Sequence, residues 1–354
     1  MTDMTRAEKA ELLRQLARER ILVKDGPYGS MIQSYGLDEA GFRGGRTFTH
    51  DQKGNNDLLN ITRPEIIGEI CEAYLEAGAD IVATNTFNAN AISQADYGIE
   101  SVVREINLAA AQITRAASDR WNARTPDKPR FVVGALGPTN KTLSVSPDVN
   151  NPGYRAVSFD EMKEVYRAQI DGLLDGGVDF ILIETIFDTL NAKAAIVAAD
   201  EAAEAREEEL PVMVSMTLTD LAGRNISGQT VEAFWHSVRH VRPLTMGMNC
   251  SFGATELHPY VGVLNAQVDS LVCVYPNAGL PNEMGAYDEA PEITAKLVRA
   301  WAENGWLNVV GGCCGTTPDH IRAISEAVRD LPPRAPIALP PALRLSGMEA
   351  ASFF

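Results

Sequence analysis

Two adjacent cysteines near the carboxyl end of the chain are the residues best suited to chemistry. Cys313 and Cys314 stand between glycines in GGCCGTTPDH, and Cys250 ends the apolar run LTMGMNC. Three thiolates with one vacant position are typical of a catalytic zinc site, because sulfur ligands suit zinc and the vacancy admits a substrate. The alternatives are a vicinal disulfide, which is strained and disfavoured in a reducing compartment, and inert buried thiols.

Such a site indicates a reaction at a thiol. Zinc held by three cysteines can bind a thiol substrate and lower its pKa, which keeps a nucleophilic thiolate at neutral pH. Zinc that activates water more usually has histidine ligands, whereas His236 and His240 lack a neighbouring carboxylate motif and are expected on a helix surface. Cys71 and Cys273 fall inside a predicted helix and strand, so we expect both in the core. The pattern favours alkyl transfer to sulfur over hydrolysis.

Eight short apolar runs alternate with helical segments along the chain. Several runs are nearly unbroken, which is typical of parallel strands covered on both faces. Eight strand–helix units predict a single-domain (β/α)8 TIM barrel, with an open doubly wound sheet as the alternative. We expect a helix at 1–20, the (β/α)8 barrel domain at 21–330 and a Pro-rich extended tail at 331–354. The runs begin at Ile21, Asp80, Arg130, Asp179, Pro211, Leu244, Ser270 and Leu307.

Several helix starts can be placed from their capping residues. Pro64 opens a helix that stops near Gly78, and Ser158 begins the capping-box pattern SFDE. The stretch 41–56, rich in Gly and Asn, is expected to form a long loop after the first strand. Further helix caps are expected at Asp188, Thr230 and Thr317.

The three cysteines can meet only if the last strand bends. In a (β/α)8 barrel the active site lies at the carboxyl ends of the strands, and strands six and eight are two places apart, so Cys250 can face Cys313 and Cys314. Adjacent residues of a regular strand point to opposite faces, so both thiols reach one ion only where the strand is distorted. The glycines that supply this backbone freedom are Gly311, Gly312 and Gly315.

Polar residues end the other strands and can hold the rest of an amino-acid thiol. Asp25 and Glu184 are carboxylates at strand ends, and each can bind a substrate ammonium, with a salt bridge or a loop cap as the alternative. Backbone amides near Gly26 can bind a substrate carboxylate. Ser215 and Asn249 also lie at strand ends and complete the expected substrate contacts.

Composition and charge narrow the range of partners. The formal net charge of −16 disfavours binding to nucleic acids and to anionic membrane surfaces. The first twenty residues contain no apolar core of a signal peptide, and no run approaches the roughly 20 apolar residues of a membrane span. We therefore expect a cytoplasmic protein, in which thiols stay reduced.

Seven motifs carry a resemblance to a known family. MGMNC together with GGCCGTTPDHI resembles the zinc motif of the homocysteine S-methyltransferases. DGPYGSMIQ, ATNTFNAN, GALGPTNKTLSVSPDVN, IETIFDTLNAKAAI and YPNAGLPN are most similar to the amino-terminal homocysteine-binding domain of cobalamin-dependent methionine synthase, over residues 11–345. The resemblance implies a (β/α)8 barrel that methylates the zinc-activated thiolate of homocysteine to give methionine. The implied zinc ligands are Cys250, Cys313 and Cys314, and the implied homocysteine contacts are Asp25, Gly26, Glu184 and Ser215.

Two departures from that family leave the methyl donor open. Pro27 and Tyr28 replace a small residue and a methionine near the substrate, and the chain ends at Phe354, soon after a stretch that resembles the linker to a folate domain. We expect a stand-alone subunit of a split methionine synthase, with an excised fragment as the alternative. Its donor is expected to be a separate corrinoid protein; the chain has no D-x-H-x-x-G motif, so cobalamin is expected only on that partner. The alternatives are direct use of a betaine or methylsulfonium donor, and a non-catalytic subunit that delivers homocysteine.

Overall fold

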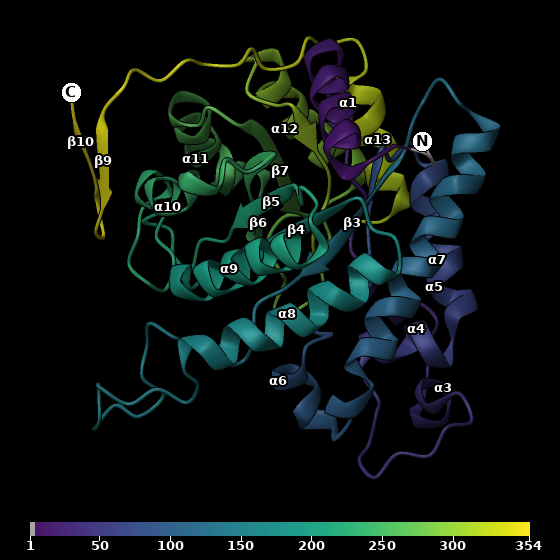
Figure 1. The fold of residues 1–354 in the computed structure, drawn as a ribbon. Helices are drawn as coiled ribbons and strands as arrows, with labels where there is room; N and C mark the ends of the chain where they lie inside the picture. Colours follow the sequence, from purple (N-terminus) through teal and green to yellow (C-terminus); the bar gives the residue numbers. More distant parts are fainter. Residues whose placement is uncertain (1–3) are drawn as a thin grey trace.

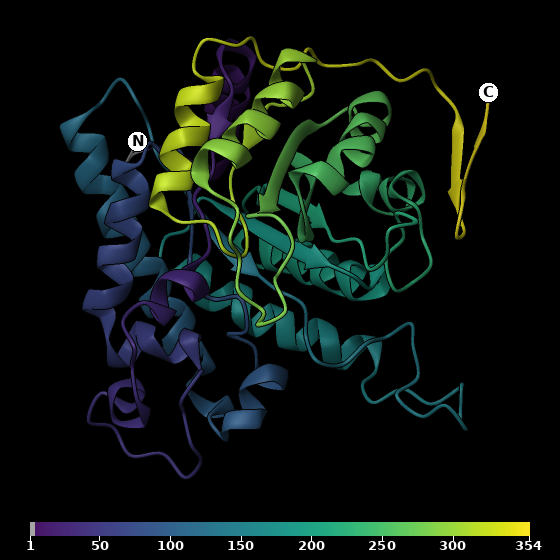
Figure 2. The same cartoon turned by 180° about the vertical axis from the view of Figure 1, so that it is seen from behind.

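A ring of eight parallel strands forms the centre of the computed structural model, which describes residues 4–354 (Figures 1 and 2). Paired strands follow the order β1-β8-β7-β6-β5-β4-β3-β2, and a parallel bridge between Lys24 and Ile81 joins β1 to β2. The predicted (β/α)8 barrel is therefore confirmed. Its strands are β1 (Leu22–Val23), β2 (Ile81–Ala83), β3 (Phe131–Leu136), β4 (Phe180–Ile186), β5 (Val212–Met216), β6 (Thr245–Gly253), β7 (Leu271–Asn277) and β8 (Val309–Val310).

The helices around the ring begin at the residues that the sequence indicated. Ser158 and Glu161 form a capping box at the start of α8, and Asp188 accepts hydrogen bonds from the first amides of α9. Pro64 opens α5, and Gly78, with φ of 112°, follows the end of that helix. The longer helices are α1 (Arg6–Glu19), α5 (Pro64–Glu76), α7 (Val103–Arg124), α8 (Phe159–Asp175), α9 (Thr189–Arg206), α10 (Val231–Val238), α11 (Ala254–Gln267), α12 (Pro291–Glu303) and α13 (Pro318–Val328).

Short helical turns lie mainly in the connections at the carboxyl ends of the strands. They are α2 (Tyr28–Gln33), α3 (Glu39–Arg43), η1 (Asn56–Leu58), α4 (Leu59–Thr62), α6 (Ala91–Gln94), η2 (Ala95–Tyr97), η3 (Glu100–Val102) and η4 (Arg239–Val241). The stretch 41–56 is a loop only in part, since α3 extends to Arg43 and η1 begins at Asn56. Asp38 explains the extra helix, because its carboxylate caps α3 by accepting a hydrogen bond from the Gly41 amide at 2.8 Å.

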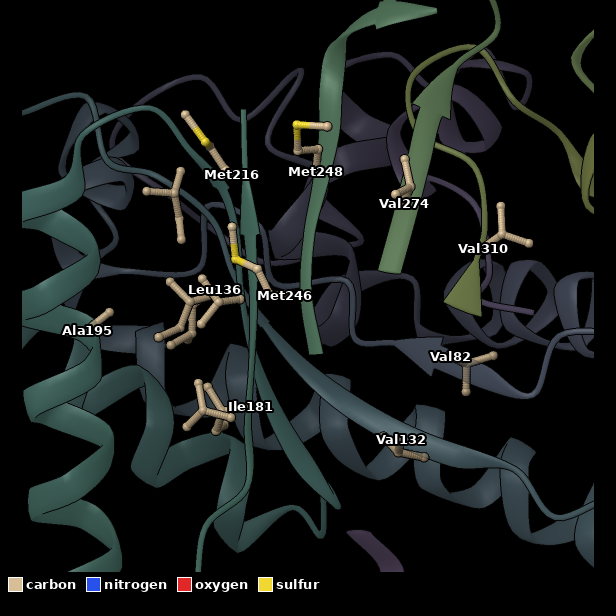
Figure 3. Packing of buried hydrophobic residues seen from close by; sticks show 14 of the residues in the cluster. Val82, Val132, Leu136, Ile181, Ala195, Met216, Met246, Met248, Val274 and Val310 are labelled. Carbon is tan, nitrogen blue, oxygen red and sulfur yellow. The ribbon is translucent and has the colours of Figure 1, made fainter. Parts of the chain in front are cut away.

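Alternate residues of each strand separate two apolar layers. One set faces the helices, as Val82, Val132, Ile181 and Val274 do in Figure 3. The other set fills the barrel interior, where helix α1 covers the amino ends of the strands with three buried side chains. The interior residues include Leu22, Ile81, Phe131, Phe180, Met213, Cys273 and Val309. Both layers are fully covered, so the strands read as unbroken apolar runs, and the polar residues at their carboxyl ends stand out.

The tail differs from the expected extended segment over its last residues. Strands β9 (Leu343–Ser346) and β10 (Ala350–Phe353) pair antiparallel as a hairpin. The hairpin is attached to α10, since the Ser346 hydroxyl donates to the Ala233 carbonyl at 2.6 Å and the Thr230 amide donates to the Met348 carbonyl at 3.1 Å. These contacts satisfy backbone groups that an isolated two-stranded hairpin would leave to solvent, and they stabilise it.

No helix within residues 4–354 combines the length and the apolar character that crossing a membrane requires.

Candidate metal and substrate site

Three cysteine side chains meet at the carboxyl end of the barrel. Cys250 lies on β6, and Cys313 and Cys314 follow β8. Their sulfur atoms all lie within 4.8 Å of one another, and the sulfurs of Cys250 and Cys314 are 3.7 Å apart. All three side chains are partly buried and none forms a disulfide. This cluster, made of soft ligands, could hold a metal ion.

Backbone distortion at two strand ends makes the cluster possible. In β6, Cys250 and Ser251 have φ of 64° and 61°, in the left-handed region, and the pairing with β7 shifts register after Asn249. Non-glycine residues in this region cost about 1–3 kcal/mol each and persist where function retains them. After β8, Gly315 also has positive φ, at 78°. The sequence predicted the second distortion from its glycines but contained no signal for the first.

Close approach rather than left-handed backbone explains the two glycines before the pair. A Cβ on Gly311 would lie 2.8 Å from the Lys24 carbonyl oxygen, and one on Gly312 would lie 2.3 Å from the Thr316 hydroxyl. The chain then turns, with the Cys313 amide donating to the Pro276 carbonyl at 2.8 Å. As a result, the two neighbouring thiols approach Cys250 from the same side of the mouth.

The three sulfurs share protons unequally. Hydrogen bonds from Cys313 and Cys314 lower the pKa of Cys250 to about 3. The hydrogen bond to Cys250 raises the pKa of Cys314 to about 11, and hydrogen bonds and burial raise that of Cys313 further. Cys250 is therefore the most acidic of the three thiols, and a bound cation would replace the remaining thiol protons.

A cavity of about 530 Å³ opens beside the cysteines. This volume is typical of a pocket for small molecules. Of the expected site residues, six line it: Gly26, Glu184, Asn249, Cys250, Cys313 and Cys314. Pro27 and Tyr28, the two departures from the resembled family, also line it, so they do shape the space next to the cysteines.

Asp25 and Ser215 lie behind the cavity wall rather than on it. Asp25 is fully buried; its Oδ1 lies 2.8 Å from the Lys24 ammonium, and its Oδ2 accepts a hydrogen bond from the Ala83 amide at 2.8 Å. Burial raises the pKa of Asp25, and Lys24 opposes this. The Ser215 hydroxyl donates to Asn249 Oδ1 at 2.6 Å. Neither side chain lines the cavity, and direct contact of Asp25 and Ser215 with a substrate stays a prediction.

Glu184 is the carboxylate that faces the cavity. Its Oε2 accepts a hydrogen bond from the Tyr275 hydroxyl at 2.9 Å. Burial raises the pKa of Glu184, while the ammonium of Lys24 and the Tyr275 hydroxyl act in the opposite direction. Within residues 4–354, no ion pair involves Glu184. A carboxylate of this kind, buried and without a direct ion-pair partner, is suited to bind the positive charge of a ligand.

Asn249 links the carboxylate to the cysteine cluster. Its Oδ1 accepts a hydrogen bond from the Thr185 amide at 3.0 Å, and its Nδ2 donates to the Thr185 hydroxyl at 2.8 Å. The same Nδ2 lies 3.7 Å from the sulfur of Cys313. Thr185 directly follows Glu184 and has φ of 55°. The two halves of the site are therefore fixed to each other through one buried amide side chain.

Four titratable residues that line the cavity were missed by the sequence analysis. Lys24 and Tyr275 lie in phase with the inward-facing residues of β1 and β7, so strand alternation could have identified them. Asp57 lies in the short turn η1 and Tyr287 on a loop, where no strand periodicity marks them. Burial raises the pKa of Asp57 to about 7 and that of Tyr287 to about 12.

The remaining cysteines and histidines stay outside the site. Cys71 on α5 and Cys273 on β7 are buried in the core, as predicted. His236 lies partly buried on α10, where its Nδ1 is 3.1 Å from the Leu345 carbonyl oxygen, and His240 is exposed. Neither histidine is within reach of the three sulfurs as a ligand.

Comparison with known proteins places this geometry in context. Residues 22–328 match the sequence model of a family described as homocysteine S-methyltransferase. The metallated form of the homocysteine methyltransferase MmuM from Escherichia coli superimposes with a TM-score of 0.68 at 21% identity, over 88% of this chain and 98% of that one. The oxidized form of that enzyme gives the same TM-score and identity over 90% and 98%. At 21% identity, these two structures show that the chain shares their fold. The family match covers most of the barrel.

Proposed function

Because the chain belongs to the homocysteine S-methyltransferase family, we propose that it methylates homocysteine with one zinc ion held by Cys250, Cys313 and Cys314. The observation that carries the proposal is the meeting of three thiols beside a cavity that also contains an unpaired carboxylate. The thiols accommodate a soft metal, and the carboxylate is suited to the ammonium of an amino-acid thiol.

The spacing of the sulfur atoms fits the ion. Tetrahedral zinc with Zn–S distances of about 2.3 Å places neighbouring sulfurs about 3.8 Å apart. The sulfurs of Cys250 and Cys314 are 3.7 Å apart in the protein alone. Three cysteines fill three positions, and the cavity provides access to the fourth. When bound, zinc would lower the pKa of a substrate thiol and keep it as a thiolate.

The protein side chains hold the rest of the substrate. Glu184 binds the substrate ammonium. The Tyr275 hydroxyl donates to Glu184 Oε2 at 2.9 Å and so orients the Glu184 carboxylate. Asn249 fixes the position of Cys313 relative to Thr185. Gly26 lines the cavity, so its backbone amide can contribute to binding the substrate carboxylate. Zinc at the cysteine cluster would hold the substrate sulfur, and the cavity beside the cluster would admit the methyl donor.

Methyl transfer follows from that orientation. The thiol proton leaves to solvent before the transfer, and the thiolate sulfur attacks the methyl carbon of the donor. A sulfur–carbon bond forms as the bond between the methyl carbon and the donor breaks, and its electron pair stays with the donor. The product is methionine, whose neutral thioether is a weaker ligand for a divalent ion than the thiolate.

We propose that the methyl donor is a corrinoid carried by another protein. The proposal rests on the motifs that are most similar to the homocysteine-binding domain of cobalamin-dependent methionine synthase. In this arrangement cobalamin stays on the partner, and the present chain contributes zinc and homocysteine. Direct use of a betaine or a methylsulfonium is the competing donor assignment.

One experiment tests both parts of the proposal. Zinc-loaded protein is incubated with homocysteine and, separately, with methylcobalamin, a methylated corrinoid protein, a betaine and a methylsulfonium, and methionine is measured. We expect methionine with the corrinoid donors. Methionine formed only from a small onium donor would overturn the donor assignment, and no methionine from any donor would overturn the methyltransferase proposal. Cys250→Ser is expected to lose zinc and activity, whereas Cys71→Ala, at a buried thiol that does not line the cavity, is expected to keep both.

A further inference from the structure

A buried lysine at the end of β1 lines the same cavity. Lys24 is 3% exposed, and its parallel bridge to Ile81 fixes its backbone where β1 meets β2. Its side chain is in phase with the inward-facing Leu22, so it points into the barrel at the level of the cavity. The ammonium lies 2.8 Å from Asp25 Oδ1 and 4.6 Å from the centre of the Tyr275 ring. The mechanism described above gives this side chain no role.

The ammonium of Lys24 is charged and only partly satisfied. Although burial alone lowers the pKa of Lys24, the carboxylates of Asp25 and Glu184 outweigh it and raise that pKa. An ammonium has three N–H donors. Within residues 4–354, Asp25 is the one hydrogen-bond acceptor that reaches it. Buried charged donors without acceptors are costly, so the remaining N–H groups are suited to an anionic group of a ligand.

Lys24 and Glu184 place one positive and one negative group at the cavity without forming a direct ion pair. No ion pair joins the two side chains, whereas Lys24 does pair with Asp25. Tyr275 lies between them, with its ring beside the ammonium and its hydroxyl on the Glu184 carboxylate. One positive and one negative group that remain separate in a cavity match the carboxylate and the ammonium of a zwitterionic amino acid.

We propose that Lys24 is a specificity-determining residue that binds the carboxylate of homocysteine, while Glu184 binds its ammonium. The inference rests on the proposed function, because it assumes that the thiol of the same molecule reaches the cysteine cluster. The connection through Thr185 and Asn249 to Cys313 supports this arrangement, since it places the Glu184 end of the ligand next to the sulfur end. The two charged ends and the sulfur then fix the substrate at three points.

The competing role for Lys24 is purely structural. A lysine that only balances the buried charge of Asp25 would stabilise the fold and would affect all ligands of the cavity alike. A lysine that binds the substrate carboxylate would matter for ligands that carry this group and for no others. Comparing homocysteine with 3-aminopropane-1-thiol, which is homocysteine without its carboxylate, separates the two roles.

The experiment measures dissociation constants by calorimetry on zinc-loaded wild type and Lys24→Met. Wild type is expected to bind homocysteine at least about 10-fold more tightly than the aminothiol, since a hydrogen bond to a charged group contributes a factor of this order. Lys24→Met is expected to weaken homocysteine binding by about 10- to 100-fold and to change aminothiol binding by less than about 3-fold. Lys24→Arg is expected to recover part of the preference for homocysteine.

Each outcome decides between the claims. Equal wild-type affinities for the two thiols, or equal losses for both ligands in Lys24→Met, would overturn the role of Lys24 and leave the proposed function in place. No binding of homocysteine to zinc-loaded wild type would overturn the proposed function itself. If Lys24→Met fails to fold because Asp25 loses its partner, Lys24→Met with Asp25→Asn replaces the ion pair by neutral side chains of similar size. That double variant is expected to show the same selective loss of homocysteine binding.

Discussion

Replacing Asn249 by alanine should reduce both the stability of the protein and the activity of the site. Asn249 is 1% exposed and joins Ser215, Thr185 and Cys313 through its amide group. Alanine removes the acceptor of the Ser215 hydroxyl and of the Thr185 amide, and it removes the N–H group beside the sulfur of Cys313. The consequences for stability and for activity can be estimated separately.

Two buried donors lose their acceptor in this variant. An unsatisfied buried donor costs about 1–3 kcal/mol, so the free energy of unfolding should fall by about 2–6 kcal/mol, or by about 1–3 kcal/mol if the Ser215 hydroxyl rotates to another acceptor. Thr185 has φ of 55° and loses both of its bonds to the amide, so it can relax and shift Glu184. Loss of a group that orients a metal ligand typically costs about 10- to 100-fold in metal affinity or activity.

The assay combines urea denaturation, zinc content and kcat/KM for homocysteine. Asn107→Ala on α7 is the matched control, because this buried asparagine donates two hydrogen bonds, to the carbonyls of Ala89 and Val103, away from the cavity. The control should lose comparable stability and keep its zinc affinity and its KM. Asn249→Ala with stability, zinc affinity and KM equal to wild type would refute the reasoning, and so would equal effects on KM in the two variants.

Three further predictions test other parts of the site. Glu184→Gln should raise the KM for homocysteine by about 10- to 100-fold, because a charge-assisted bond to the ammonium becomes neutral, with zinc content unchanged; an unaltered KM would exclude Glu184 as the ammonium ligand. Dialysis against a strong zinc chelator should lower the melting temperature, and added zinc should restore it, because zinc binds the folded cysteine cluster. If neither treatment changes the melting temperature, the cysteine cluster is not a metal site. Burial raises the pKa of Asp57 from 3.8 to about 7, so the folded protein retains a proton that the unfolded chain releases, and the free energy of unfolding should fall between about pH 4 and pH 7 by up to about 4 kcal/mol. Asp57→Asn should remove this pH dependence, which urea denaturation between about pH 4 and pH 7 measures. If the free energy of unfolding varies with pH equally in wild type and Asp57→Asn, Asp57 is not the group responsible.

The barrel could be predicted from the sequence because its signals are local. Apolar runs covered on both faces, the capping box at Ser158 and the cap at Asp188 each depend on a few neighbouring residues. Cys250 could be placed opposite Cys313 and Cys314 because the order of strands in a closed barrel fixes which strand ends are near each other. The fold and the meeting of the cysteines could be predicted from these signals, and the family from the motifs around them.

Contacts between distant loops and strands could not be predicted in the same way. Asp25 was expected to touch the substrate because it ends an apolar run, yet the preceding Lys24 occupies the interior position and pairs with it. Asp57 reaches the cavity only because its loop folds against the segment after β2, where the Asn88 amide donates to it at 2.9 Å. The hairpin of the tail likewise depends on hydrogen bonds to α10, which its Pro-rich composition does not reveal.

X-ray absorption at the zinc edge tests the central claim most directly. The measurement uses zinc-loaded protein with and without homocysteine, alongside metal analysis of the same samples. The proposal predicts one zinc per chain with three sulfur ligands from Cys250, Cys313 and Cys314, and a fourth sulfur when homocysteine is added. A folded protein that takes up no zinc, or zinc bound through nitrogen and oxygen ligands alone, would contradict it.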